Sequence, residues 1–183
     1  MKIMHTHLEG CLLIEPKVIY DDRGYFMESF NERQFHNETG IDVHFVQDNR
    51  SYSTKGVLRG LHYQTGEFAQ AKLVSVLDGE ILDVAVDIRP ESKTYGQYSS
   101  VILSGDNKRQ FFIPRGFAHG FVVVSDTATV FYKCDNYYNK EHETGILFSD
   151  QMLNINWQIP VEQLIISEKD KNQPEFSKAL KIW

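Results

Sequence analysis

Two histidines lie inside apolar runs that have strand character. His62 belongs to GVLRGLHYQ (56–64), and His119 belongs to FIPRGFAHGF (112–121). A neutral imidazole is a suitable base near pH 7, and it is also a common metal ligand. A buried histidine can equally be a structural residue of a packed core. An acid–base site, a metal site and a packed core therefore remain to be distinguished by the surrounding residues.

The metal interpretation requires several imidazoles and a carboxylate that converge on one ion. In a cupin-type barrel two of these histidines often alternate on one strand as H-x-H, but the stretch here is His62-Tyr63-Gln64. His5 and His7 have this spacing, but they lie among the first residues, which we expect to be mobile. The sequence therefore predicts that no metal is bound.

A lysine opens the apolar run that follows the first histidine. An unpaired cation buried in such a run is costly, so Lys72 must face solvent, a partner or a ligand. Lys72 shares strand parity with Val74 and Val76. If these valines line the interior of a barrel, the ammonium does too; if they lie on the outer face, Lys72 is simply exposed. The sequence leaves both orientations open.

An arginine and a tyrosine complete the set of reactive side chains. Arg59 and His62 differ in parity, so they would point to opposite faces of a regular strand. Gly60 between them permits a bulge that would bring both inward. Tyr132 lies in another expected strand, where it could be an ordinary packing residue.

Short β segments dominate the rest of the chain. Residues 72–88 contain two β runs around Asp78-Gly79, a dipeptide typical of a hairpin turn. Alternation in the second run separates two faces, with Leu82, Val84, Val86 and Ile88 on one and Asp83, Ala85 and Asp87 on the other. Further strands are expected at 98–103, 109–113, 118–125 and 128–133, and helices only at 30–37 and after Ser167. This pattern predicts an all-β fold, a cupin-type jelly-roll barrel or sandwich with a few short helices.

Composition limits the class of protein. The 183 residues fit a single domain over 1–183, without repeats or linkers. The net charge of −6 argues against nucleic-acid binding, which needs a basic face. Cys11 and Cys134 form neither a disulfide framework nor a zinc motif. No stretch has the length of a membrane span or a signal peptide, so we expect a cytoplasmic protein.

Several segments together resemble the dTDP-4-dehydrorhamnose 3,5-epimerase family, metal-free cupins that act on nucleotide-linked 4-keto-6-deoxy sugars. The similarity extends from about Arg23 to Asp170, most of the chain. The matching segments are DDRGYFMESF (21–30), VQDNRSYS (46–53), GVLRGLHYQ (56–64), AKLV (71–74), IPRGFAHGF (113–121), YKCDNYY (132–138) and EHETGI (141–146).

The resemblance implies a role for each matching residue. His62 would be the base, paired with Asp170, and Tyr132 would be the acid on the opposite face of the sugar. Lys72 would steady the enolate. Arg59 and His119 would hold the diphosphate and the sugar, with Asp83 supporting the histidines. The remaining substrate-binding residues would be Arg23, Phe26, Glu28, Gln47, Asp48, Asn49, Tyr138, Glu143 and Lys169, some of them from the neighbouring subunit of a homodimer.

The chemistry is consistent with these residue types. A ketone at C4 acidifies the protons at C3 and C5, so a histidine base, a cation beside the ketone oxygen and a phenol on the far face suffice. Neither redox chemistry nor a cofactor is needed. The sequence leaves open a single-site epimerase or ketoisomerase on a related sugar and, more distantly, a metal-dependent cupin enzyme or a non-catalytic sugar-binding barrel. Ser167 and Asp170 also fit a helix cap, and Arg23-Gly24 also fits a turn.

Overall fold

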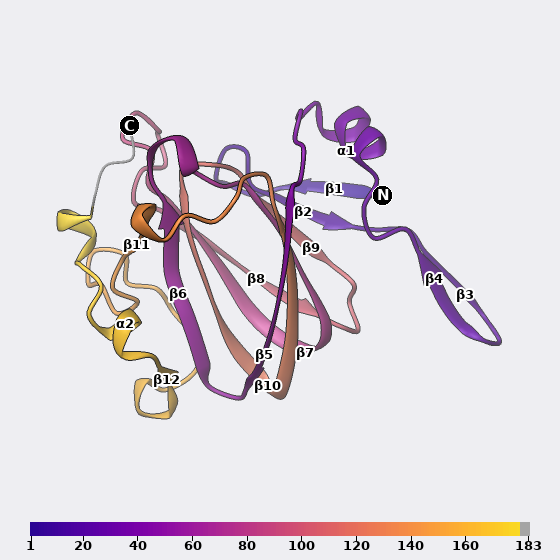
Figure 1. Cartoon of the computed structure of the whole chain (residues 1–183). Coiled ribbons are helices and arrows are strands. Elements are labelled where there is room, and N and C mark those ends of the chain that lie inside the picture. The colour runs from indigo at the N-terminus through magenta and orange to yellow at the C-terminus, as the bar shows by residue number, and fades with distance from the viewer. Residues whose placement is uncertain (180–183) are drawn as a thin grey trace.

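Two long strands organise the fold: β7 (Lys72–Asp87) and β10 (Phe117–Cys134), which pair antiparallel along most of their length. The structure is a computed structural model that describes residues 1–179 of the chain. The main sheet has the order β1-β2-β9-β7-β10-β6-β11, and β8, β5 and β12 pair with β7, β10 and β6 (Figure 1). The shorter strands are β1 (Lys2–His5), β2 (Leu12–Glu15), β5 (Gln47–Thr54), β6 (Val57–Gln64), β8 (Tyr98–Ser104), β9 (Gln110–Ile113), β11 (Glu143–Gly145) and β12 (Ile165–Ile166).

The two halves of each long strand have different neighbours. The first half of β7 pairs with β9 through 72–75, and the second half pairs with β8 through 80–86. In β10, residues 119–122 pair with β6 and residues 127–134 pair with β5. The long strands therefore pass from one layer of the sandwich to the other. This confirms the predicted all-β, cupin-like jelly roll.

The hairpin predicted at Asp78-Gly79 is wrong, because β7 continues through this dipeptide as one strand. The pairing with β10 shifts on both sides of it, and Gly79 has φ 77°. A Cβ at this glycine would lie 1.9 Å from the carbonyl oxygen of Thr127. A bulge of the G1 type and a type I′ turn both need a residue with positive φ, so the same dipeptide can serve either. The segments 118–125 and 128–133 likewise belong to the single strand β10.

The predicted helices are present. The helix α1 (Glu32–Thr39) begins after Asn31, whose side chain accepts a hydrogen bond from the backbone N–H of Gln34 at 3.0 Å. The short helix α2 (Glu168–Lys171) begins after Ser167. Single-turn 3₁₀ helices occur at Gly66–Phe68, Lys140–His142, Val161–Gln163 and Phe176–Lys178. The expectation of mobile first residues is wrong, because His5 lies in β1 and is paired with Leu12 of β2.

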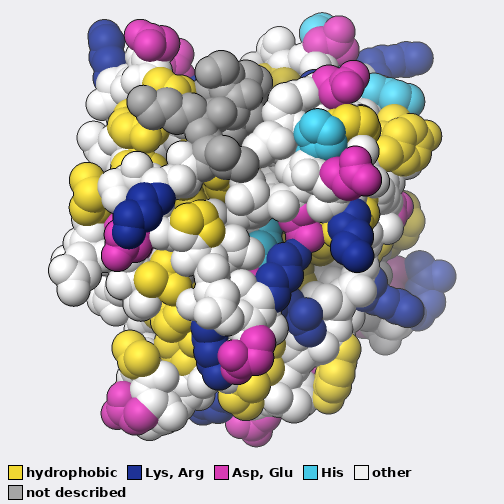
Figure 2. Space-filling view, turned by 60° about the vertical axis from the view of Figure 1, so that its left-hand side comes forward, with side chains coloured by type: hydrophobic (Ala, Val, Ile, Leu, Met, Phe, Trp, Pro, Cys, Tyr) yellow, Lys and Arg dark blue, Asp and Glu magenta, His cyan; other side chains and the backbone are white. Residues whose placement is uncertain are grey.

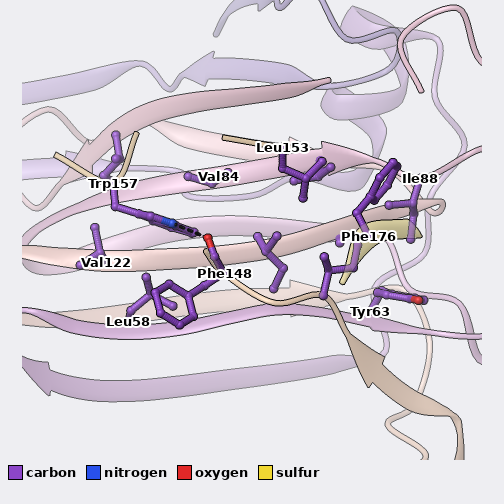
Figure 3. Packing of buried hydrophobic residues seen from close by; sticks show 14 residues of the cluster. Leu58, Tyr63, Val84, Ile88, Val122, Phe148, Leu153, Trp157 and Phe176 are labelled. Carbon is purple, nitrogen blue, oxygen red and sulfur yellow. Dashed lines mark hydrogen bonds between the residues drawn. The ribbon is translucent and has the colours of Figure 1, made fainter. Parts of the chain in front are cut away.

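Hydrophobic residues pack both between the layers and on their outer faces. The interior cluster contains side chains of both layers, among them Val74, Ala85 and Val130, so the face of β7 that carries Lys72 and Val74 points inward. In the second half of β7, the opposite face packs against the C-terminal segment (Figure 3). Trp157 lies in that C-terminal segment, and its indole N–H donates a hydrogen bond to the carbonyl oxygen of Phe148 at 2.9 Å.

A hairpin of β3 (Val18–Asp21) and β4 (Gly24–Met27) forms a separate two-stranded sheet that projects from the body (Figure 1). Arg23 and Gly24 lie at its tight turn, as the alternative interpretation suggested. Large apolar side chains of this hairpin are exposed, and Phe26 retains 70% of its accessible surface. Within residues 1–179, no helix is long and apolar enough to cross a membrane.

Candidate active site

One end of the sandwich interior is hollow and lined by polar side chains. The larger cavity has a volume of about 610 Å³, and a smaller neighbouring cavity has a volume of about 230 Å³. His62, Lys72 and Tyr132 line both cavities. Figure 2 shows a recess on this side of the molecule, with a histidine at its floor and lysine or arginine side chains beside it.

His62 of β6 forms a dyad with Asp170 of α2. Its Nε2 lies 2.6 Å from Oδ1 of Asp170, whose side chain is only 5% exposed. Burial alone would raise the pKa of Asp170, but hydrogen bonds from His62, the backbone N–H of Gly60 and Ser167 together lower it. An ionised Asp170 accepts a hydrogen bond from Nε2–H, which keeps the proton on Nε2 and leaves Nδ1 of His62 as the basic nitrogen.

The turn that carries Asp170 is a helix N-terminus. The backbone N–H of Asp170 donates to Oγ of Ser167 at 3.1 Å, so the capping interpretation of this pair is correct. The cap orients α2 so that the Asp170 side chain points back at β6, where Oδ2 lies 3.4 Å from the backbone nitrogen of Gly60. The structural and the functional interpretations of this residue are therefore compatible.

A second histidine–carboxylate dyad lies deeper. Nε2 of His119 in β10 is 2.7 Å from Oδ1 of Asp83 in β7, and Asp83 is fully buried. Its other oxygen, Oδ2, has no hydrogen-bond partner within residues 1–179. His119 lines the larger cavity, whereas Asp83 lies behind it and orients its ring.

Lys72 lines the same cavities as His62. Its ammonium forms neither a hydrogen bond nor a salt bridge within residues 1–179, although the side chain lines both cavities. Burial lowers the pKa of the Lys72 amine, and nearby acidic groups, Cys134 first among them, offset this only in part. Such an amine is positioned to stabilise a negative charge that develops in the cavity.

Tyr132 of β10 faces the same space. Burial, together with the neighbouring Cys134, raises the pKa of its phenol to about 12. The phenol is therefore fully protonated at neutral pH and can act as a proton donor. Its neighbours across the sheet are Asn49 of β5 and Val74 of β7.

The bulge predicted at Gly60 is present. Across it, Arg59 pairs with Phe121 and His62 pairs with His119, so β6 carries one more residue than β10 over this interval. Arg59 and His62 consequently line the same cavity despite their different parity. Nε of Arg59 donates to Oγ of Ser53 at 3.2 Å, which leaves the terminal guanidinium nitrogens unpaired within residues 1–179.

Three residues form a polar bridge beside the two cavities. The Tyr138 hydroxyl donates to Oε2 of Glu143 at 2.9 Å, and Lys169 forms an ion pair with the same oxygen. Burial would raise the pKa of Glu143, but the bonds from Lys169 and Tyr138 lower it. The bridge connects β11 to the residue that precedes Asp170. Tyr138 and Glu143 line the smaller cavity and Lys169 lines the larger one.

Some expected site residues lie elsewhere in this chain. Arg23, Phe26 and Glu28 belong to the projecting hairpin and its exit, and none of them lines either cavity. Arg23 instead pairs with Asp21 at 2.5 Å. Asp48 also lies outside the cavities. It forms a salt bridge with Lys133, whose Nζ lies 2.9 Å from Oδ1 of Asp48.

The inward face of β5 shows why Asp48 differs from its neighbours. Residues of one parity, Gln47, Asn49, Ser51 and Ser53, are partly or fully buried, whereas those between them are exposed. Gln47 and Asn49 line the smaller cavity, and Ser51 lines the larger one. Ser51 and Ser53 were not predicted, although period-two alternation along QDNRSYST was a signal that could have found them.

A metal site would need several donor side chains that converge on one point. No group of three or more His, Cys, Asp or Glu side chains converges in this way within residues 1–179. A histidine–carboxylate dyad, a buried amine and a protonated phenol around one cavity can instead remove a proton beside a carbonyl group, stabilise the resulting enolate and return a proton.

Comparison with known proteins agrees with this chemistry. The family model described as dTDP-4-dehydrorhamnose 3,5-epimerase matches residues 5–178. The enzyme of that name from Shigella flexneri is 53% identical over 176 residues, 96% of each chain. The crystal structure of the one from Elizabethkingia anophelis has a TM-score of 0.95, with 55% identity over 100% of this chain and 99% of that one. A dTDP-6-deoxy-D-glucose-3,5-epimerase from Legionella pneumophila, in complex with dTDP-4-keto-L-rhamnose, has a TM-score of 0.93 and 51% identity, covering 97% of this chain and 93% of that one.

Proposed function

Because the chain belongs to the dTDP-4-dehydrorhamnose 3,5-epimerase family, we propose a two-sided proton-transfer mechanism for its residues. The reaction is the inversion of C3 and C5 of dTDP-4-dehydro-6-deoxy-D-glucose, which gives dTDP-4-dehydro-L-rhamnose. The ketone at C4 acidifies the protons on both neighbouring carbons. Each inversion therefore requires a base on one face of the sugar, stabilisation of the enolate and an acid on the other face.

His62 is the proposed base. Asp170 holds the proton on Nε2, so Nδ1 is free to take the proton from carbon, and the carboxylate then stabilises the imidazolium that forms. The dyad is mostly buried, so the attraction between the two charges is screened less than it would be in water.

Lys72 is the proposed group that stabilises the enolate oxygen. Its ammonium has no salt-bridge partner within residues 1–179, so its charge is not neutralised by a carboxylate in contact with it. Electrostatic stabilisation of this kind acts on the transition state, where the charge develops, and typically contributes ~10²–10³-fold to the rate.

Tyr132 is the proposed acid. Its pKa of about 12 keeps the proton in place until the enolate forms. His62 and Tyr132 come from different strands and both line the two cavities, which supports their placement on opposite faces of a bound sugar.

The two cavities supply binding groups for the rest of the substrate. Arg59 and His119 in the larger cavity suit the diphosphate and the sugar hydroxyls. Gln47, Asn49 and Tyr138 in the smaller cavity suit the thymidine, since an exposed aromatic ring stacks well on a base.

The projecting hairpin supports a homodimer. Arg23, Phe26 and Glu28 lie away from the cavities of their own chain, and apolar side chains of the hairpin are exposed. We infer that the hairpin reaches the site of a second copy and completes it there. A protein that is strictly monomeric and fully active at the assay concentration would contradict this.

We also propose the cytoplasm as the location, because Cys11 and Cys134 are both free thiols.

The observation that supports this function most strongly is that His62, Lys72 and Tyr132 share one polar hollow. The test is proton NMR in heavy water with dTDP-4-dehydro-6-deoxy-D-glucose, following C3 and C5 separately. Deuterium and inverted stereochemistry at both carbons are expected. Inversion at one carbon would identify a single-site epimerase, and migration of the ketone would identify a ketoisomerase.

A further inference from the structure

Two buried side-chain polar atoms have no hydrogen-bond partner within residues 1–179: Oγ of Ser51 and Oδ2 of Asp83. Both belong to residues at the candidate active site, since Ser51 lines the larger cavity and Asp83 orients His119. An unpaired buried polar atom destabilises a fold, because it has lost its bonds to water without replacement. Its presence in a cavity wall is explained if a ligand supplies the missing partner.

Ser51 differs from the other residues on its face of β5. Gln47 donates to Oδ1 of Asn49 at 3.1 Å, and Nδ2 of Asn49 contacts Sγ of Cys134 at 3.6 Å. Ser53 accepts the bond from Nε of Arg59. Ser51 lies between Asn49 and Ser53 and has no such partner.

The surroundings of Ser51 indicate the chemistry of the ligand. Ser53, the next inward residue of β5, holds Arg59 so that its terminal nitrogens remain unpaired within residues 1–179. An anionic or carbonyl-type oxygen bound by this guanidinium would also lie beside a hydroxyl donor from Ser51. A serine hydroxyl changes direction by rotation about χ1 alone, so Ser51 can turn toward a bound group without movement of the backbone.

We propose that Ser51 is a substrate-binding residue whose hydroxyl donates to an oxygen of the sugar–diphosphate unit beside Arg59. This inference rests on the proposed function. The oxygen belongs either to the diphosphate or to the sugar, and both accept a hydrogen bond from a hydroxyl. A bond to an ionised phosphate oxygen would be the stronger of the two.

The test is Ser51→Ala, with Ser75→Ala as the matched control. The Ser75 hydroxyl of β7 does have a partner, because it donates to the carbonyl oxygen of Phe131 at 3.0 Å. Ser51→Ala should retain or raise the melting temperature and lower kcat/KM by about 10- to 150-fold, the range for a hydrogen bond to a charged group. Ser75→Ala should lower the melting temperature and leave kcat/KM unchanged.

Titration calorimetry with dTDP and with the dTDP-sugar separates the two oxygen sources. Weaker binding of both ligands to Ser51→Ala assigns the bond to the diphosphate, and weaker binding of the sugar nucleotide alone assigns it to the sugar. If kcat/KM of Ser51→Ala stays within about twofold of wild type and both affinities are unchanged, the proposal is wrong. A wild-type protein without epimerase activity in the same assay would instead overturn the proposed function itself.

Discussion

Replacing Asp170 with asparagine tests the His62–Asp170 dyad while it preserves the shape of the side chain. The carboxylate accepts from Nε2 of His62 at 2.6 Å on one oxygen and lies 3.4 Å from the nitrogen of Gly60 on the other. An amide offers only one acceptor. If its oxygen faces Gly60, its NH₂ group faces His62 and moves the ring proton to Nδ1, the nitrogen that must act as the base.

The size of the effect follows from this geometry. A hydrogen bond to a charged group contributes about 1.5–3 kcal/mol. At about 1.4 kcal/mol per tenfold in rate, loss of this bond alone lowers kcat by roughly 10- to 150-fold. A change of tautomer would remove the base altogether and extend the loss toward ~10⁴-fold, the upper range for general base catalysis.

Steady-state kinetics of Asp170→Asn, measured beside Glu168→Gln, gives the comparison. Glu168 belongs to the same short helix, but it is exposed and pairs with Lys171. Its variant therefore loses one charge without touching His62 and should retain the wild-type kcat. A kcat for Asp170→Asn within about threefold of wild type would refute the role given to the dyad.

Three further predictions concern the charge of Lys72, the stability of the fold at low pH and activity after treatment with a chelator. Lys72→Met should lower kcat by ~10²–10³-fold, because the enolate loses its cation, and steady-state kinetics would show this; an unchanged kcat would remove Lys72 from the mechanism. The pKa of Asp87 is lowered, because hydrogen bonds from Arg89, Ser92 and Thr94 outweigh burial. The ionised carboxylate therefore stabilises the fold fully above the unfolded-state pKa of 3.8, and this contribution is lost as the pH falls through the lower folded-state pKa. Urea unfolding carried from pH 7 to well below pH 3.8 should show this decline in the free energy of unfolding, and Asp87→Asn should make the decline shallower. The same pH dependence in Asp87→Asn and in the wild type would contradict the assignment. Enzyme treated with a chelator should retain full activity, whereas recovery that requires a divalent metal would favour the metal-dependent alternative.

Strand parity in the sequence reduced the wall of the site to a few alternatives, and the structure decides between them. Lys72 points inward because Val74 and Val76 do, and the bulge at Gly60 brings Arg59 and His62 into one cavity. Parity also separates Asp48, which is exposed, from Gln47 and Asn49, which face inward, so a role of Asp48 in binding stays a prediction. Alternation between buried and exposed positions is a local property, so it can be read from one strand alone.

Other features depend on contacts that no local pattern contains. Asp170 lies 108 residues from His62, so only the family resemblance could suggest their pairing. The dipeptide Asp78-Gly79 provides a positive φ, but whether the chain reverses or bulges there depends on Thr127 and the rest of β10 packed against it. The unpaired hydroxyl of Ser51 becomes visible only when every neighbour of β5 is placed.

The central claim is that His62 and Tyr132 act on opposite faces of the sugar, and Tyr132→Phe in heavy water tests it most directly. This variant lacks the phenolic proton but retains His62, Asp170 and Lys72, so the enolate still forms and His62 can return a deuteron to the original face. We expect deuterium at C3 or C5 with inversion reduced by ~10²–10⁴-fold, whereas His62→Ala should show neither exchange nor inversion. Inversion by Tyr132→Phe at close to the wild-type rate would contradict the mechanism.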